Sequence, residues 1–117
     1  TGDIIAYYSD RRLKEILGNI DNALEKLQKI SGVYYEPNEL ALQKGYINNG
    51  REIGLIAQHV QSVLPEVIEI APFDLDKYGE SKSGEKYLTI QYNMIVPLLV
   101  EALKKQKEQI DYIKSKL

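Results

Sequence analysis

Residues Asn93–Leu117 of this chain read NMIVPLLVEALKKQKEQIDYIKSKL. From Leu99 onward, apolar residues and one glutamine recur at alternating intervals of four and three, with lysine and glutamate between them. This is the heptad spacing of a coiled coil. It predicts a long helix with a self-associating seam formed by Leu99, Leu103, Gln106, Ile110, Ile113 and Leu117. The polar seam residue can fix the register of an oligomer. A single amphipathic helix packed on its own domain is the alternative.

Two strands are predicted ahead of this helix. Residues 66–70 read EVIEI, and residues 87–92 read YLTIQY, whose side chains alternate with a period of two. The residues between them, Asp74–Lys86, are polar and include two glycines. We therefore predict a β-hairpin with a long, mobile tip.

The first half of the chain predicts a mixture of helices and short strands. Apolar residues spaced 4, 3, 4, 3 from Leu13 to Leu27 predict a helix of about five turns, ended by Ser31–Gly32. Short strands are predicted at residues 3–8 (DIIAYY) and 33–37 (VYYEP), and a short helix at residues 57–64 (AQHVQSVL). The predicted fold class is α+β, in which small strands and a hairpin pack with an N-terminal helix, a short central helix and the long final helix.

Composition excludes several classes of function. The chain has 117 residues, 44% of them hydrophobic, and a formal charge of −2, which is typical of one soluble domain. It has no cysteine, which excludes thiol chemistry, and its one histidine, His59, forms no ligand motif with Glu66 and Glu69. We expect no metal and no cofactor. The chain contains no basic block and no apolar run long enough for a bilayer, so we expect no nucleic-acid or membrane partner.

The N-terminal residues show no signal-peptide pattern, and the sequence does not begin with Met. We therefore expect the chain to be a piece of a longer protein.

Residues 9–14 (SDRRLK) place a hydroxyl five residues before a lysine, at a predicted junction between strand and helix. A serine hydroxyl becomes nucleophilic when a base takes its proton, and a desolvated lysine can be that base. Such a pair requires Ser9 to lie outside the helix, because side chains five residues apart on one helix point in different directions. In the structural alternative, Ser9 or Asp10 caps the helix and Lys14 pairs with Asp10.

Three motifs together resemble a known family. They are SDRRLK at 9–14, IGLIAQ at 53–58 followed by VLPEV at 63–67, and YLTIQY at 87–92 running into IVPLLVEAL at 95–103. In this order the chain resembles, over nearly its whole length, the C-terminal intramolecular chaperone domain of phage tailspikes, tail fibres and neck appendages, also called the peptidase S74 domain. One departure is His59, where the family usually has an acidic residue.

The resemblance implies a homotrimer, held by a trimeric coiled coil, that helps an upstream β-rich fibre of the same polypeptide to fold. It also implies a serine endopeptidase that cuts itself away once. In the family the cut falls at the serine–aspartate junction, with that serine and the lysine five residues on as the catalytic pair. Ser9 and Lys14 match those positions, and Ser9–Asp10 matches the cleavage site.

Residues 1–9 would then be the end of the fibre and the junction, and residues 10–117 the chaperone domain. The protein would fold in the host cytoplasm, and the upstream part would remain in the virion tail or appendage after this domain is released.

Three further residues are candidates for supporting roles. Arg12, or backbone N–H groups at the helix start, would stabilise the developing oxyanion. Gly54 would let a backbone approach closely, and Gln58 would orient the cleaved segment. The alternatives are that Gly54 marks a strand-end turn and that Gln58 is an exposed helix residue.

Two other functions compete with this one. A non-catalytic trimerisation module of a phage fibre is the first, because the chain continues unbroken across Ser9–Asp10 where a release product would begin at Asp10. A fibre tip that binds a host glycan through its tyrosines is the second, and nothing in the sequence favours it. The Asp74–Lys86 tip either contacts the nascent fibre or is an idle turn.

Overall fold

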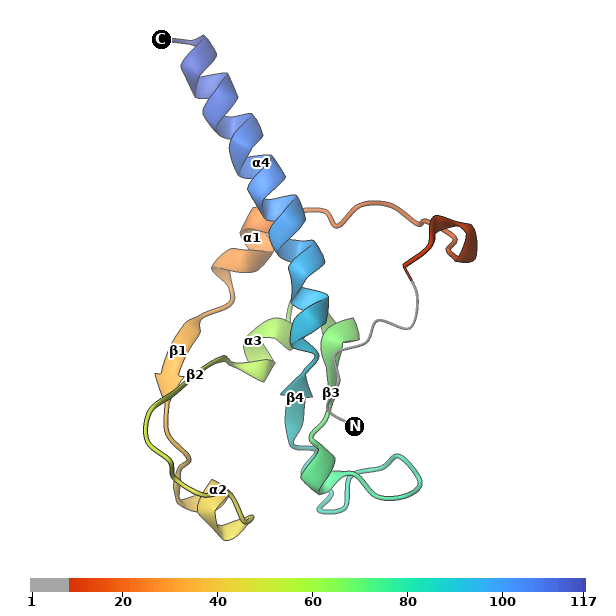
Figure 1. Ribbon diagram of the computed structural model, residues 1–117, viewed down its shortest axis with the longest axis vertical. Coiled ribbons are helices and arrows are strands. Elements are labelled where there is room, and N and C mark those ends of the chain that lie inside the picture. The colour runs from red at the N-terminus through yellow and green to blue at the C-terminus, as the bar shows by residue number, and fades with distance from the viewer. Residues whose placement is uncertain (1–8) are drawn as a thin grey trace. The chain divides into compact units, whose positions relative to one another are not determined.

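The computed structural model describes residues 9–117. The strand predicted at residues 3–8 lies outside the described residues, as does nearly all of the segment 1–9. The chain is a mixed α+β protein with two small antiparallel strand pairs and a long C-terminal helix (Figure 1). The predicted fold class is confirmed.

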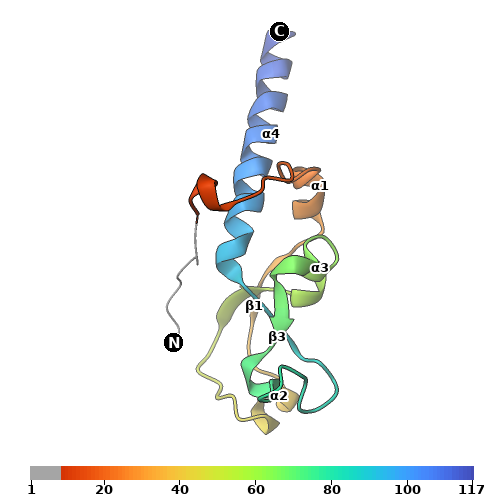
Figure 2. The ribbon, with the colours of Figure 1, turned by 90° about the vertical axis from the view of Figure 1, so that its right-hand side faces the viewer.

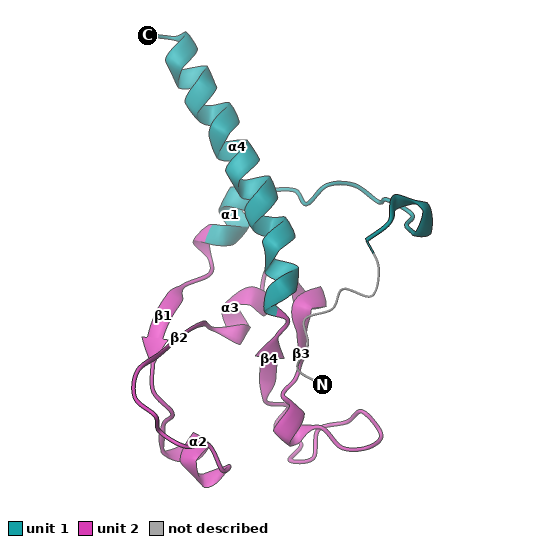
Figure 3. Ribbon diagram, viewed as in Figure 1, with its two compact units in different colours: residues 1–27, 92–117 teal, residues 28–91 magenta. Residues whose placement is uncertain are grey.

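The described chain divides into two compact units (Figure 3). One unit is continuous and consists of Gln28–Gln91. The other combines the described residues up to Leu27 with Tyr92–Leu117, so in the sequence the whole of the first unit lies between its two parts. We refer to them as the continuous unit and the discontinuous unit.

The discontinuous unit is built on helix α4, Val96–Ser115, which follows the 3₁₀ turn η4, Tyr92–Ile95. Leu98 and Ala102 are fully buried on one side of the helix. Glu101 accepts a hydrogen bond from the Asn19 side chain at 3.1 Å. The predicted C-terminal helix is confirmed, and Figure 1 shows it as the longest element of the chain.

The five-turn helix predicted for the first part of the chain is wrong. Between Ser9 and Ser31 the described chain forms only the 3₁₀ turn η1, Arg11–Leu13, and the helix α1, Ala23–Gln28. Gly18 between them has φ of +146°, which is outside helical geometry. The Leu17 side chain is 96% exposed, so no described residue covers it. A helix of this kind draws most of its stability from burying its apolar stripe, and this segment has neither a cover for Leu17 nor helical geometry at Gly18.

The continuous unit contains both strand pairs. Strands β1, Gly32–Tyr35, and β2, Glu52–Leu55, pair antiparallel. Strands β3, Ile68–Ile70, and β4, Leu88–Ile90, also pair antiparallel, with Ile68 opposite Ile90. The predicted hairpin is therefore confirmed, with shorter strands than expected because Pro65–Val67 forms the 3₁₀ turn η2.

Two short helices complete this unit. Helix α3, Ala57–Gln61, confirms the predicted central helix. Helix α2, Glu39–Gln43, was not predicted and lies in the connection between β1 and β2, at the end of that hairpin (Figures 1 and 2). The Asn38 side chain caps α2 by accepting the Ala41 N–H at 2.9 Å, the hydrogen bond that a helix start requires.

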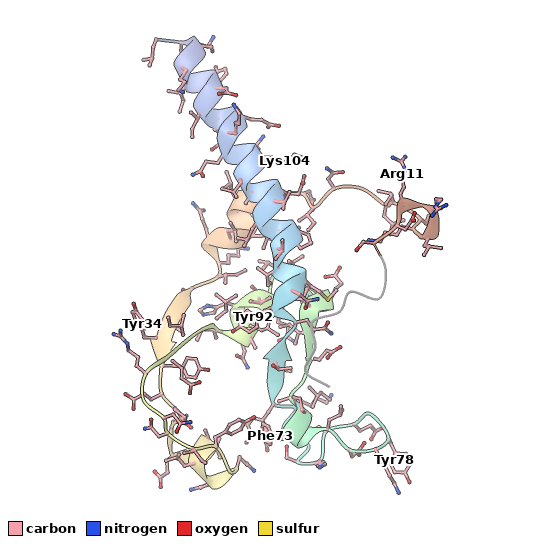
Figure 4. The ribbon with its side chains drawn as sticks, viewed as in Figure 1. Arg11, Tyr34, Phe73, Tyr78, Tyr92 and Lys104 are labelled. Atoms are coloured by element: carbon pink, nitrogen blue, oxygen red, sulfur yellow. The ribbon has the colours of Figure 1, made fainter. Side chains whose placement is uncertain are left out.

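The core of the continuous unit forms where α3 meets the β3–β4 pair. Val60 on α3 is 0% exposed, and Val67, Ala71 and Ile90 are also buried. Phe73 lies between two tyrosine rings, with centroids 5.6 Å from Tyr46 and 5.6 Å from Tyr87, and Figure 4 labels it.

The tip of the β3–β4 hairpin is not the mobile loop that its composition suggested. Asp74 is only 2% exposed, and its carboxylate accepts the Ser81 hydroxyl at 2.6 Å, the Ser83 N–H at 2.9 Å and the Tyr87 N–H at 3.1 Å. Polar residues order this segment because they converge on one buried acceptor. Only the outer part, including Tyr78, extends away from the unit (Figure 4).

Candidate functional site

The candidate cleavage junction lies directly before the turn η1. Asp10 has extended backbone angles, φ −67° and ψ 127°, and is the N-cap residue of η1. Its carbonyl accepts the Leu13 N–H at 3.0 Å, and the Arg11 carbonyl accepts the Lys14 N–H at 3.1 Å. Ser9 therefore lies outside the helix, as a serine–lysine pair requires, and Lys14 ends the same turn.

The Asp10 side chain is held by Arg12. Its Oδ1 accepts the Arg12 N–H at 2.8 Å and the Arg12 Nε–H at 3.2 Å, and its Oδ2 accepts Nη2–H at 2.8 Å. The Arg12 side chain, and next its backbone N–H, lower the pKa of Asp10 below 3.8. The capping role expected of Asp10 is present, and the sequence alone did not indicate this pairing with Arg12.

Ser9, Lys14 and their neighbours in this turn are exposed. A hollow of about 480 Å³ in the same unit is lined by other residues, among them Asn19, Glu25, Glu101 and Lys104, and does not include Ser9 or Lys14. Proton transfer between a serine and a lysine requires a site that excludes water, because desolvation is what lowers the pKa of a lysine. A single chain leaves this junction open to solvent.

The other two candidate residues belong to the continuous unit. Gly54 lies on β2, half-buried, opposite Val33 on β1. Gln58 lies in α3 and is exposed. His59 beside it carries an Nδ1 atom that is buried and makes no hydrogen bond in the described part of the chain.

The predicted seam residues of α4 are exposed, as are all residues from 103 to 117. Leu103 is 65% exposed and Ile113 59% exposed, whereas Leu98 and Ala102, on an adjacent face near the helix start, are buried. Leu99, Ile110 and Leu117 are also exposed, and Gln106 lies among them. An exposed apolar stripe of this length is typical of an interaction surface.

Neither a metal site nor a membrane span stands out in residues 9–117. Over these residues, no three His, Cys, Asp or Glu side chains cluster in a way that would hold a metal ion. In the same stretch, no helix combines the length and apolar character that crossing a membrane demands.

Residues 9–69 match the family model described as chaperone of endosialidase, Peptidase_S74. The chain belongs to this family. The matched region of the chaperone of endosialidase domain begins at Ser9 and includes Lys14, Gly54 and Gln58. The predicted resemblance to the intramolecular chaperones of the S74 family is confirmed.

Curated relatives extend the similarity to α4. The long tail fiber proteins Gp37 of Enterobacteria phages K3 and T2 are each 36% identical over 93% of this chain. Gp37 of Salmonella phage S16 is 30% identical over 93% of the chain. The chain spans only 8%, 7% and 13% of these three relatives. It therefore corresponds to a small part of each fibre protein.

Proposed function

We propose that this chain is the C-terminal chaperone domain of a longer phage fibre protein, and that it cuts itself away once at Ser9–Asp10. The observation that carries the proposal is the family match that begins at Ser9, on the junction that the sequence motif marks. Residues 1–9 then belong to the fibre, which stays in the virion, and residues 10–117 form the domain that is released after folding in the host cytoplasm.

A trimer is proposed because the seam of α4 is apolar and exposed in the single chain. Each leucine or isoleucine that three helices bury contributes roughly 1.5–3 kcal/mol. Gln106 at the middle of the seam would set the register, since a mismatched pairing would bury its amide without a partner.

The benefit to a fibre follows from chain topology. A β-rich fibre of three chains folds slowly, because contacts between distant residues have to form, and its unpaired strand edges aggregate meanwhile. A trimeric domain that holds three chains together raises their effective concentration. Cutting after assembly then leaves the fibre kinetically trapped in its folded state.

In the proposed chemistry, neutral Lys14 takes the proton of the Ser9 hydroxyl, and Oγ attacks the carbonyl carbon of the Ser9–Asp10 bond. The carbon–nitrogen bond breaks, and Asp10 leaves with a proton from Lys14 as a new amino terminus. Water then hydrolyses the ester, which restores the hydroxyl and leaves a carboxylate. One turnover per junction suffices, so the fold needs no separate substrate pocket.

The attacked carbonyl belongs to a neighbouring copy in this scheme. Ser9 Oγ and the Ser9 carbonyl carbon are joined through Cβ and Cα, so attack within one residue would close a strained four-membered ring. Assembly would bring the exposed junctions of three chains together and exclude water from them. Gly54 and Gln58 would receive and orient the incoming segment.

The cut is tested by intact-mass analysis of a chain that carries its upstream fibre, with Ser9→Ala, Lys14→Ala and the matched control Lys29→Ala. We expect the wild type and Lys29→Ala to divide between Ser9 and Asp10, and the other two variants to stay whole. Cleavage that persists in Ser9→Ala would refute the dyad.

Attack between copies is tested with mixed trimers of wild-type chains and tagged Ser9→Ala chains. We expect the tagged chain to be cut at its substituted junction, directly before Asp10, because its neighbour supplies the hydroxyl. A tagged chain that stays whole in trimers whose wild-type members are cut would rule this out.

A non-catalytic trimerisation module is the second candidate, and the exposed α4 seam favours it independently of any cut. Sedimentation equilibrium tests the trimer that both functions share, with Leu103→Asp expected to give monomers and Lys105→Ala, a charged position off the seam, expected to stay trimeric. A wild type that is trimeric but never cut would establish this module instead.

A further inference from the structure

The Asp10–Arg12 contact immediately follows the proposed scissile bond, and both carboxylate oxygens take part in it. Besides the three hydrogen bonds already described, Arg12 Nε–H lies 3.3 Å from Oδ2. The guanidinium therefore meets the carboxylate side-on through Nε and Nη2. We call this contact the Asp10–Arg12 clamp.

The clamp differs from an ordinary surface ion pair in its geometry. Most exposed ion pairs contribute little because two long side chains must be held in one arrangement. Here the partners are two residues apart, and the Arg12 backbone N–H donates to the same carboxylate as the side chain. A bidentate guanidinium contact fixes orientation as well as distance.

The clamp lies on the side of the Ser9–Asp10 bond that carries the leaving amine. The Asp10 nitrogen is the group that departs, and the clamp holds the Asp10 side chain while Leu13 N–H holds the Asp10 carbonyl at 3.0 Å. The same two interactions start the turn that ends at Lys14. The conformation of residues 10–14 is thus set by Asp10 and Arg12 together.

The clamp also changes the charge beside the reacting carbonyl. An Asp10 carboxylate without the guanidinium would repel the negative charge that develops on the neighbouring carbonyl oxygen. The guanidinium contact offsets this charge. Two of its three nitrogens, Nε and Nη2, donate to Asp10. Fewer N–H donors are therefore left for the oxyanion role expected from the sequence.

We propose that Arg12 is a positioning residue for the self-cleavage, which acts through the Asp10 carboxylate to hold the leaving residue and the turn that carries Lys14. This inference rests on the proposed function. In this proposal Arg12 binds the Asp10 carboxylate, and backbone N–H groups stabilise the oxyanion.

The test measures the first-order cleavage rate of the fibre-bearing chain by intact mass. Arg12→Ala and Asp10→Asn are each expected to cut roughly 10- to 100-fold more slowly, because the reacting groups lose their alignment. The double variant should be within about twofold of the slower single variant, since both substitutions break one interaction. Arg12→Lys should be intermediate, because it keeps the charge but not the bidentate contact.

Arg11→Ala is the matched control, since Arg11, which Figure 4 labels, lies in the same turn and is exposed. It should cut at the wild-type rate. Equal rates for Arg11→Ala and Arg12→Ala would overturn the clamp. A slow Arg12→Ala with a wild-type rate for Asp10→Asn would also overturn it, because Arg12 would then act without Asp10.

Failure of the proposed function would look different. An uncut wild type, or a Ser9→Ala chain that is still cut, would refute the dyad, and an uncut wild type would end any positioning role with it. NMR titration of Asp10 reads the contact itself, since removal of Arg12 should raise the Asp10 pKa. An unchanged Asp10 pKa in Arg12→Ala would overturn the clamp whatever the cleavage result.

Discussion

Two segments of this chain depart from their sequence patterns in opposite directions. Residues 14–22 belong to a helical apolar stripe, yet they run as an irregular connection whose Leu17 is almost fully exposed. Residues 74–87 are polar and glycine-containing, yet they fold closely around the buried Asp74 carboxylate. No surface among the described residues covers the apolar segment. The polar segment contains the Asp74 carboxylate, which accepts its hydrogen bonds.

The difference shows that order follows from satisfied partners rather than from hydropathy. A periodic apolar stripe stabilises a helix mainly when another surface covers part of it, as α4 is covered at Leu98 and Ala102. A carboxylate that accepts three hydrogen bonds can order a polar loop within one chain, since each donor would otherwise be left unpaired. The second segment needs no partner chain, and in the proposed trimer the first would depend on assembly for its cover.

The largest expected effect comes from Asp74→Ala, which removes the acceptor of the Ser81, Ser83 and Tyr87 donors. We expect the loop to open and the unfolding temperature to fall by several degrees. Amide hydrogen exchange at Ser83 and Tyr87 measures the opening directly.

The matched control is Asp76→Ala. Asp76 accepts the Tyr78 and Glu80 N–H groups near the solvent, where water can replace it. Exchange at Tyr87 should stay slow in this variant. Equal loss of protection in both variants would show that Asp74 has no special place in the loop.

Acid should open the same loop. The Ser81 hydroxyl, followed by the backbone and side-chain hydrogen bonds of Ser83 and by the Tyr87 amide, lowers the pKa of Asp74 from 3.8 to about 2. A folded pKa below the unfolded one adds stability that is present above pH 4 and is lost as the pH falls through about 2. In the wild type the NMR shifts of the loop amides should change over this pH range. In Asp74→Asn they should show no transition in that range.

Leu17→Ser tests the dependence on assembly. The side chain is 96% exposed, so the variant should change the unfolding free energy of the dilute single chain by less than about 0.5 kcal/mol. Trimer stability should fall by roughly 1–3 kcal/mol for each copy if assembly buries it. Sedimentation across a concentration series, with Glu15→Ser as the control, distinguishes the two states, and an unchanged trimer would place Leu17 outside the interface.

Gly18→Ala has the smallest expected effect on stability. The informative outcome is whether the substitution stabilises or destabilises the protein. The φ of +146° disfavours alanine, although a Cβ at this position meets no neighbouring atom. We expect a loss of about 1 kcal/mol in the single chain. A gain of similar size in the trimer, measured by thermal unfolding, would show that residues 14–22 become helical on assembly, because alanine favours a helix over glycine by about 1 kcal/mol.

Sequence alone predicted the elements with the most regular patterns, including α4, whose seam is exposed in the single chain. The heptads predicted α4, the alternation in YLTIQY predicted β4, and the spacing before Pro65 predicted α3. Helix α2 was missed because its residues, ELALQ, place leucine at 40 and 42, which is not a helical spacing. At the junction, the Asp10 cap followed from residue type, whereas the choice of Arg12 as its partner depended on the turn geometry.

The discontinuous unit has a consequence for the timing of synthesis. A ribosome makes Ser9 and the turn that follows it first, but α4 appears only after all of Gln28–Gln91 has been added. At about 5–20 residues per second this delay is roughly 3–13 seconds. A chain interrupted within that interval would carry the proposed cleavage junction without the helix that completes its unit. The order of translation itself would then withhold cutting until the far end of the domain has been made.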